Sequence, residues 1–548
     1  MFAMENHLRR LFVQTTRNPE PTGKVSYLFC LLLSVFVSIW QNGSAPHMPY
    51  AATYYVDADS GSNTNSGSSA ESAWKTLEKV NSTTFRPGNR ILFKSGSVWT
   101  GQLWPKGSGS AERPIFIDKY GGDALPVVNG AGLSEDAVLL KNQEYWEIRN
   151  LEITNAGATP ASAMRRGVDV IAENCGDLHH IYLQNLAVHD VNGSFKDKVN
   201  GGIHYRSIGD SKPSRFVDLR IENNHIWHVD RSGIFGWSTH WTRRNWYPSL
   251  GVVIRWNRLD DIGGDGIVNV ATDGALVEHN VVSHASQRSQ DYNVGIWPFS
   301  ADNTIVQYNE VYGTRGQHDA EGFDSDWNSR NTIIQYNYSH DNDGGFLLIC
   351  NEGSQSPDDS AGNVGTIVRY NISQNDHHRG IKLSGPVKNT LIYNNTMYVG
   401  KGESTDLVLH TDWTGWASDT YIYNNIFYVE GTGKFGYGVK GNEDGSYDSA
   451  PGPGKSLNNV YDSNVYYGVQ PPDDAHAITS DPLLENPGHA AHGIQTVAGY
   501  GLRPGSPAIN SAKMIANPGA MDFAGTPVPQ CGLPDRGAME SKICSSRK

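Results

Sequence analysis

The sequence predicts a single all-β domain built as a solenoid, in which short parallel strands stack as successive coils. Two recurring features support this prediction: an apolar strand that ends in Asn, and a Gly followed by a large apolar residue. Self-similarity at about 20–50 residues is typical of solenoids. The repeated units are rich in β-branched residues and polar turns and lack a helical period, so strands are expected rather than helix pairs.

The Asn motif recurs from Ile148-Arg-Asn-Leu-Glu-Ile to Ile422-Tyr-Asn-Asn-Ile-Phe. From Asn224 onward its asparagines occupy positions 257, 280, 309, 337, 371, 395 and 425. An Asn stacked at the same turn of every coil can bond to the backbone of its own turn and to the amides above and below, which gives buried turn groups partners. The spacing therefore predicts an Asn ladder.

The second feature sets the expected register of the coils. It occurs at Gly233, Gly266, Gly295, Gly322, Gly345 and Gly380. Because side chains alternate along a strand, the residue after each Gly is expected to point inward, and the second and fourth residues outward. The second position then reads Phe235, Val268, Trp297, Asp324, Leu347, Lys382, and the fourth reads Trp237, Val270, Phe299, Asp326, Ile349, Ser384. One coil thus places two carboxylates beside a coil with two aromatic rings.

Residues 1–50 are expected to be an export signal with a long leader, because basic residues precede the apolar run Val25–Trp40. A secreted, periplasmic or cell-surface location follows, without integral membrane association after cleavage. In an exported chain Cys531 could pair with Cys544, while Cys175 and Cys350 are expected to be buried thiols. The net charge of -13 argues against nucleic-acid binding, which needs a basic surface.

Segments at both ends of the chain resemble a known superfamily. The opening Thr53-Tyr-Tyr-Val-Asp, which leads to Ala73-Trp-Lys-Thr-Leu77, and the closing Ser480-Asp-Pro-Leu-Leu and Pro534-Asp-Arg-Gly are similar to those of pectate-lyase-like proteins. The resemblance covers roughly residues 53–540 and implies a right-handed parallel β-helix domain with a tail at 541–548. It also implies a polysaccharide or oligosaccharide substrate, because members mostly hydrolyse glycans or act as lyases or epimerases on uronic-acid chains.

Glycoside hydrolysis is the first functional hypothesis. It needs one protonated and one ionised carboxyl group and no cofactor. Asp324 and Asp326, two apart on one strand face, are separated by about 6.6 Å at the backbone, which suits an inverting pair, whose carboxyls lie about 6.5–9.5 Å apart. Asp is disfavoured within strands, which favours a functional role for both. Glu321 and Asp343 are alternatives, as are Asp319 and Asp341, although acids near turns can simply cap them.

A cation-assisted lyase or epimerase is the alternative. Related lyases use a Lys or Arg base and often calcium. Lys382 shares the outward column of Asp324 two coils away, about 9–10 Å in backbone terms, and Glu321, Asp324 and Asp326 could hold Ca²⁺. The absence of lysine between Lys212 and Lys382 favours the hydrolase. A non-catalytic carbohydrate-binding or adhesin solenoid is a further alternative.

Substrate binding is expected from side chains around the acidic strand. The candidates are the aromatic platforms Trp297, Phe299, Trp327 and Trp241, and the polar groups His318, His378 and Arg379. Two insertions, Ser238–Leu250 and Glu352–Asn363, interrupt the repeat. Insertions that leave the same corner of different coils are expected to wall a cleft.

Overall fold

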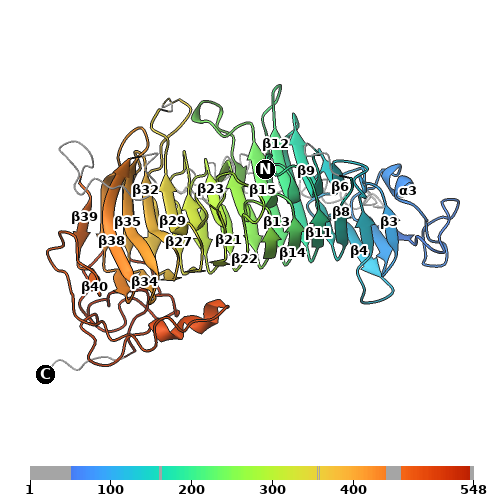
Figure 1. Cartoon of the computed structure of the whole chain (residues 1–548). Coiled ribbons are helices and arrows are strands. Elements are labelled where there is room, and N and C mark those ends of the chain that lie inside the picture. Colours follow the sequence, from blue (N-terminus) through green and yellow to red (C-terminus); the bar gives the residue numbers. More distant parts are fainter. Residues whose placement is uncertain are drawn as a thin grey trace, which may run out of the picture. The chain divides into compact units, whose positions relative to one another are not determined.

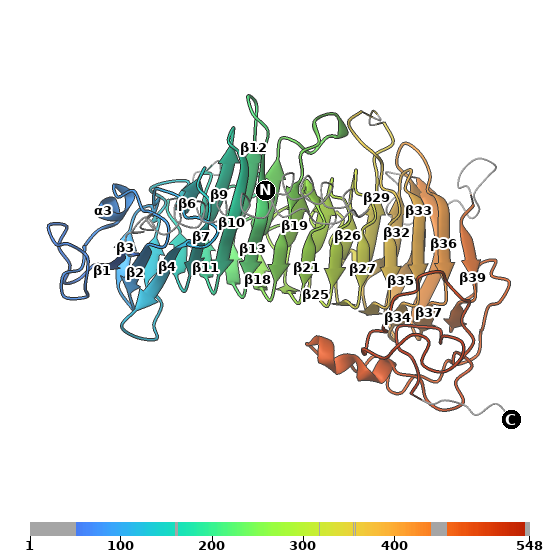
Figure 2. The ribbon, with the colours of Figure 1, turned by 180° about the vertical axis from the view of Figure 1, so that it is seen from behind.

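The computed structural model describes residues 51–158, 163–316, 318–354, 356, 358–439 and 458–542. Their strands stack coil on coil into three sheets in which the paired strands are parallel (Figure 1), and the stacking is equally visible from behind (Figure 2). The predicted parallel β-helix is therefore confirmed. The predicted export signal and Cys544 lie outside the described residues. No helix among the described residues is long and apolar enough to cross a membrane.

The three sheets contain sixteen, thirteen and eleven strands. The sixteen-stranded sheet runs from β1 (Thr53–Val56) to β39 (Val460–Asp462), and the thirteen-stranded sheet from β3 (Val98–Thr100) to β40 (Val465–Tyr467). The eleven-stranded sheet contains, in spatial order, β6 (Asp136–Lys141), β9 (Arg166–Glu173), β12 (Gly201–Ile208), β15 (Ser232–Ser238), β19 (Ile267–Val270), β23 (Ile296–Phe299), β26 (Glu321–Ser325), β29 (Gly345–Cys350), β32 (His378–Ser384), β35 (Ser404–Asp412) and β38 (Thr432–Val439).

Apolar side chains fill the interior of the coil from its first turn. The short helix α3 (Leu77–Asn81) begins after Thr76, whose hydroxyl accepts a hydrogen bond from the Lys79 amide, and it buries Leu77 and Val80 in the core. Along the eleven-stranded sheet the inward residues are Ile234, Ile267, Ile296, Phe323, Leu347 and Ile381, each at most 1% exposed.

The predicted register was wrong in one coil. Gly345 pairs with Glu321 rather than with Gly322, so Leu347 and Ile349 point into the core. The outward positions of β29 are therefore those of Leu348 and Cys350. The cause lies in the turn, because Gly345 has a φ of +133° and a Cβ there would lie 1.4 Å from the carbonyl oxygen of Arg379. This glycine satisfies a tight turn instead of marking the strand position that the other glycines mark.

The predicted Asn ladder is confirmed and extends one coil further, to Asn464. In each ladder coil the side-chain Oδ1 accepts from the backbone amide and the Nδ2 of the preceding Asn, and the Nδ2 donates to a backbone carbonyl. The ladder begins at Asn224, because the equivalent positions of the two preceding coils hold Leu151 and Leu186.

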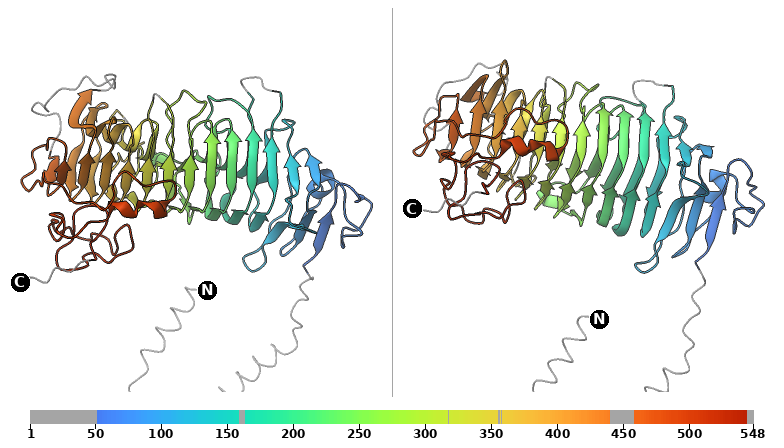
Figure 3. Two further views of the ribbon diagram at one scale, coloured as in Figure 1. Left: turned by 60° about the horizontal axis from the view of Figure 1, so that its bottom comes forward. Right: turned by 90° about the horizontal axis from the view of Figure 1, so that it is seen from below.

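The closing segment differs from the predicted further coils. After β40, the described residues form one 3₁₀ helix, η2 (Ile494–Tyr500), and irregular chain held by isolated bridges. Figure 3 shows this segment, in red, along the side of the coil. It packs Val497 and Tyr500 against apolar residues of the thirteen-stranded sheet, and the Tyr500 hydroxyl donates to Gln374 at 2.8 Å. The segment therefore covers one outer face of the last coils.

The ladder predicts a large penalty for removing one rung. Asn309→Ala removes the Oδ1 that accepts from both the backbone amide and the Nδ2 of Asn280, and it leaves that buried amide without its partner. We expect a loss of about 2–4 kcal/mol in the free energy of unfolding, because buried unpaired backbone groups cost about 1–3 kcal/mol each. Urea denaturation measures it. The control, Asn486→Ala on the exposed closing segment, should change stability by less than about 0.5 kcal/mol, and equal effects would contradict the ladder's role.

Candidate active site

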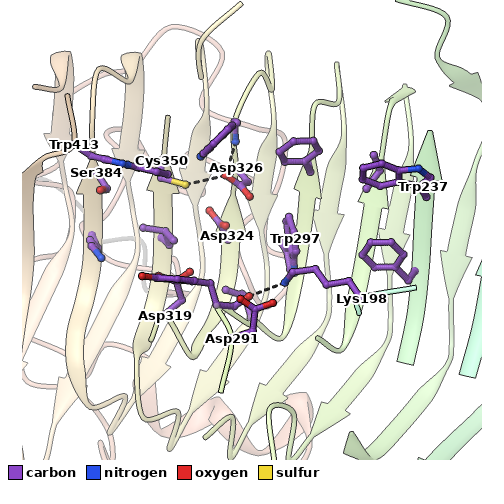
Figure 4. Close-up of a pocket in the computed structure, with 18 residues that line it drawn as sticks. Lys198, Trp237, Asp291, Trp297, Asp319, Asp324, Asp326, Cys350, Ser384 and Trp413 are labelled. Carbon is purple, nitrogen blue, oxygen red and sulfur yellow. Dashed lines mark hydrogen bonds between the residues drawn. The ribbon is translucent and has the colours of Figure 1, made fainter. Parts of the chain in front are cut away.

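A cavity of about 460 Å³ opens on the outer face of the eleven-stranded sheet, over β15, β23, β26, β29 and β32. Figure 4 shows Asp324 and Asp326 in the middle of its wall, with Trp297 on one side and Cys350 and Ser384 on the other. The lining residues are Lys198, Phe235, Trp237, Val270, Asp291, Tyr292, Val294, Trp297, Phe299, Asp319, Asp324, Asp326, Trp327, Leu348, Cys350, Lys382, Ser384 and Trp413.

Aromatic rings form a large part of this wall. Trp297 and Phe299 stand on β23 in the coil next to the acidic strand, as predicted. The ring centroid of Trp327 lies 6.2 Å from that of Phe299 and 5.3 Å from that of Trp413. The indole Nε1 of Trp297 donates to buried Asp265 at 3.0 Å, which fixes the ring. Flat apolar faces of this kind are suited to the C–H faces of sugar rings.

Asp324 is the most enclosed of the cavity carboxyls. It stands on β26 with only 2% of its surface exposed, and its Oδ1 has no hydrogen-bond partner among the described residues. Burial, with smaller contributions from the charges of Asp326 and Asp319, raises the pKa of Asp324 well above its usual value. The buried environment therefore favours the protonated form of the Asp324 carboxyl.

Asp326 follows β26 directly and is partly exposed. Its carboxylate accepts hydrogen bonds from the Trp327 amide at 2.6 Å and from the thiol of Cys350 at 3.0 Å. Burial raises the pKa of Asp326 to about 6, although both hydrogen bonds oppose the rise. The Cys350 thiol remains protonated, because burial and the neighbouring carboxylates raise its pKa.

The carboxyl groups of Asp324 and Asp326 approach each other at the end of β26. One oxygen of each carboxyl and the Cys350 sulfur all lie within 4.8 Å of one another, and Asp326 directly follows the last residue of β26.

Glu321 and Arg379 lie beneath the cavity rather than in its lining. Glu321 is 0% exposed and forms an ion pair of 3.5 Å with Arg379, which is itself 2% exposed. The Arg379 guanidinium also donates to the carbonyl of Asp319 at 3.0 Å. Burial raises the pKa of Glu321 to about 7, and the Arg379 charge opposes the rise. This pair holds the backbone that carries Asp319.

The three residues considered for Ca²⁺ do not form one group of close ligand atoms. Among the described residues, the group at this site contains Asp324, Asp326 and the thiol of Cys350, without Glu321. Ca²⁺ prefers six to eight ionised or carbonyl oxygen ligands. A thiol beside carboxyls whose pKa is raised is a poor match for that ion.

Two lysines reach the cavity from different coils. Lys382 occupies the same outward column as Asp324, two coils away, as predicted, and is 3% exposed. Lys198 was not predicted. Its Nζ donates to Asp265 at 2.8 Å and to the carbonyl of Tyr292 at 2.6 Å. Only the folding of a loop from a distant coil brings Lys198 here, so no local pattern indicates it.

Besides Glu321 and Arg379, four further predicted site residues do not line the cavity. Asp343 stands in a turn and pairs with Arg315 at 2.6 Å. The His318 ring stacks 5.0 Å from that of Tyr292, and Trp241 packs behind Phe299 at 5.4 Å. His378 is exposed at the start of β32. These residues support the lining or lie apart from it.

The two insertions contact each other, but no described residue of either one is among those that line the cavity. The backbone amide of Arg243 donates to the carbonyl of Asp359 at 3.3 Å. The Arg243 guanidinium also bonds to Asp302 at 2.6 and 2.9 Å and to Asn328 at 2.7 Å. The contact joins coils that are far apart in sequence and fixes the rim beside Trp327.

Sequence reasoning missed several lining residues. Trp413 and Tyr292 come from loops without a repeat landmark, and Cys350 was placed in the core by the register error in β29. Asp319 was only an alternative to the strand pair, yet it lines the cavity and is partly exposed. The run Asp319-Ala-Glu-Gly-Phe-Asp-Ser-Asp itself was the available signal.

Together these features define a parallel β-helix with an acidic, aromatic-lined cavity on one sheet, an arrangement suited to carbohydrate. The chain is 31% identical over 613 aligned residues to lacto-N-biosidase from Bifidobacterium longum subsp. longum, in an alignment that covers 90% of this chain and 36% of that protein. The chain therefore spans about a third of the length of this curated relative. No family model matches it.

Two solved structures of the GH136 lacto-N-biosidase from Eubacterium ramulus are also similar. The native protein is 28% identical with a TM-score of 0.57, and 65% of each chain is covered. The selenomethionine derivative is 25% identical with a TM-score of 0.58, and 79% of this chain and 70% of that chain are covered. The likeness extends over most of the coil.

The carboxyl cluster predicts a pH-dependent stability. Below about pH 4 the Asp324 carboxyl is protonated in both the folded and the unfolded protein. Above that pH the carboxyl ionises first in the unfolded protein, because its pKa is raised in the folded one. The free energy of unfolding therefore falls as the pH rises. Asp324→Asn removes this penalty. We expect it to stabilise the protein by more than about 1 kcal/mol at pH 7 and little at pH 4, since one pKa unit corresponds to about 1.4 kcal/mol.

Urea denaturation at the two pH values tests this. The control is Asp343→Asn, which removes an exposed ion pair and should change stability by less than about 1 kcal/mol at either pH. Destabilisation by Asp324→Asn at pH 7 would show instead that the carboxyl is ionised and partnered in the folded protein.

Proposed function

We propose that this chain is a glycoside hydrolase acting on oligosaccharides, with Asp326 and Asp319 as the reacting carboxyls. The observation that carries the proposal is the group of cavity carboxyls in contrasting environments, set beside Trp297, Phe299 and Trp327. Glycoside hydrolysis uses two carboxyls of opposite protonation state. The similarity to two proteins called lacto-N-biosidase supports the same class of reaction.

Asp326 is assigned as the general acid. A proton donor works best when its pKa lies near the operating pH and when it can reach the leaving oxygen. Asp326 satisfies both conditions, because its pKa is raised to about 6 and its side chain is partly exposed in the cavity. In the reaction its proton moves to the glycosidic oxygen as the bond from that oxygen to the anomeric carbon breaks.

Asp319 is assigned as the carboxylate that acts at the anomeric carbon. It lies in the cavity wall, is partly exposed, and is close enough for its charge to contribute to the raised pKa of Asp326. Its backbone is fixed in a left-handed conformation with φ +51°, and its carbonyl accepts a hydrogen bond from buried Arg379. Asp319 is therefore held in one position while the sugar binds.

Asp324 has a different role in this proposal. At 2% exposure it offers little surface to a substrate, and burial raises its pKa. The raised pKa reduces the negative charge that Asp324 places beside Asp319 and Asp326. Asp324 is thus a positioning residue, and the proposed hydrolysis requires no metal.

The cavity favours a short glycan segment. A volume of about 460 Å³ is in the range of pockets that enclose a small ligand, and Trp327 and Trp413 close one side with rings 5.3 Å apart. We propose a substrate with a disaccharide unit such as lacto-N-biose, in line with the name of the relatives. A secreted or cell-surface location remains part of the proposal, because glycans of this kind are extracellular substrates.

A lyase remains the second candidate, because Lys382 lines the cavity in the column of Asp324 and could serve as a base. The two reactions have different products. Hydrolysis releases a reducing sugar, whereas β-elimination leaves an unsaturated uronate that absorbs ultraviolet light. A binding solenoid gives neither product.

Three Asn variants test the assignment of the carboxyls on p-nitrophenyl β-lacto-N-bioside and a panel of neutral and uronic-acid oligosaccharides. We expect Asp319→Asn and Asp326→Asn to lower kcat/KM by about 10²–10⁴, and Asp324→Asn by about tenfold or less. Asp343→Asn, outside the cavity, should be unchanged.

A large loss of kcat/KM in Asp324→Asn with little loss in Asp319→Asn would show that Asp324, and not Asp319, is the carboxylate that acts at the anomeric carbon. Unsaturated products that disappear in Lys382→Ala would replace the hydrolase with the lyase. Bound glycan without any product would favour the binding solenoid.

The proposed acid predicts a particular pH profile. Because Asp326 must be protonated and its pKa is raised to about 6, kcat/KM should fall as pH rises above about 6. Cys350→Ala removes a hydrogen bond that favours the ionised form, so the pKa should rise and the alkaline limb should move to higher pH. Cys175→Ala, remote from the cavity, is the matched control; an unmoved limb in Cys350→Ala would remove Asp326 from the role of acid.

A further inference from the structure

A second cluster of possible ligands lies on another sheet, where the closing segment meets the coil. It consists of Glu310 on β25 (Glu310–Tyr312), His340 on β28 (Tyr338–His340), and His492 just before η2. One ligand atom from each residue lies within 4.8 Å of the other two. Both strands belong to the thirteen-stranded sheet, whereas the cavity stands on the eleven-stranded sheet.

We propose that Glu310, His340 and His492 form a site for a divalent transition metal, with Zn²⁺ as the first ion to test. Two imidazoles and one carboxylate are a donor set that zinc takes in proteins, with the fourth position left to water. Imidazole nitrogen selects such ions over Ca²⁺ and Mg²⁺, which prefer oxygen. The exposure of His492 leaves room for that water.

The second contact of His340 is of the kind that a metal-binding histidine makes. Its Nδ1 lies 2.7 Å from the carboxylate of Asp341, which directs Nε2 toward Glu310 at 3.2 Å. A metal-binding histidine characteristically donates its other ring N–H to a carboxylate, which fixes the tautomer and raises the basicity of the ligating nitrogen. Both His340 and Glu310 are at most 5% exposed and so are held in place.

The remaining contacts orient the other two ligands. The Tyr312 ring stacks 4.7 Å from that of His340 and 4.4 Å from that of His492. The Gly493 amide donates to Glu310 at 2.6 Å, which anchors the chain next to His492. The two buried donors are therefore held by their neighbours, and the exposed His492 is oriented by the Tyr312 ring and by the anchored chain at Gly493.

The site would join the closing segment to the wall of the coil. Glu310 and His492 are separated by 182 positions in the sequence (492 − 310), and the segment between them includes the last coils. A metal that binds the folded state and not the unfolded one adds to stability by mass action. The inference is independent of the proposed hydrolase, because none of the three residues lines the cavity.

The test uses the full chain without an affinity tag, stripped of metal by a chelator and titrated with Zn²⁺ by calorimetry. All proteins carry Cys350→Ala, which removes the thiol from the other group of close ligand atoms. We expect one Zn²⁺ per chain and a rise in Tm on binding. His492→Ala should weaken binding by at least about tenfold, and Asp341→Asn by about 10–100-fold.

The matched control is His489→Ala, which removes an exposed histidine three residues away and should bind Zn²⁺ as the parent does. The metal-free Tm of His492→Ala should equal that of the parent, which separates lost binding from misfolding. Equal binding by the His492 and His489 variants would overturn the proposal. So would a parent that neither binds Zn²⁺ nor gains Tm, which would leave the cluster as an ion-pair network only.

Discussion

The stacking of one coil on the next is the constraint on which the rest of this structure depends. Each coil pairs its strands in parallel with those above and below, and from Asn224 to Asn464 the Asn ladder joins one corner of each coil to the next. Once that corner is fixed, strand alternation decides which side chains fill the core and which face outward. A site built on outward side chains therefore inherits its precision from the ladder.

The acidic strand departs from this plan in a way that points to function. Glu321 and Asp324 occupy buried positions where the next coil has Gly345 and Leu348, and burial raises the pKa of both. Such a cluster lowers the stability of the folded protein at neutral pH, and the stabilising contribution of the Asn ladder and the apolar core offsets this loss. Local conflict with the rules of the fold is typical of catalytic sites, and here it coincides with the aromatic wall of the cavity.

Much of the fold was predictable because its signals are local and repeated. The period of the Asn motif and the alternation along β23 and β26 gave the solenoid, the ladder and the pairing of Trp297 with the acidic coil. The prediction failed in β29 because Gly345 looks like the other landmark glycines but serves a tight turn. A one-residue slip exchanges inward for outward side chains, which removed Cys350 from the predicted face.

The sequence by itself determined the class of fold and the strand that carries the carboxyls, because both are encoded in short-range periodicity. Only the tertiary structure decided which acids share the cavity and how exposed each is, because Lys198, Asp291 and Trp413 arrive from separate loops. It also decided that Glu321 lies beneath the floor with Arg379. Burial and charge proximity depend on which distant coils meet in space, and these set the pKa values on which the chemistry depends.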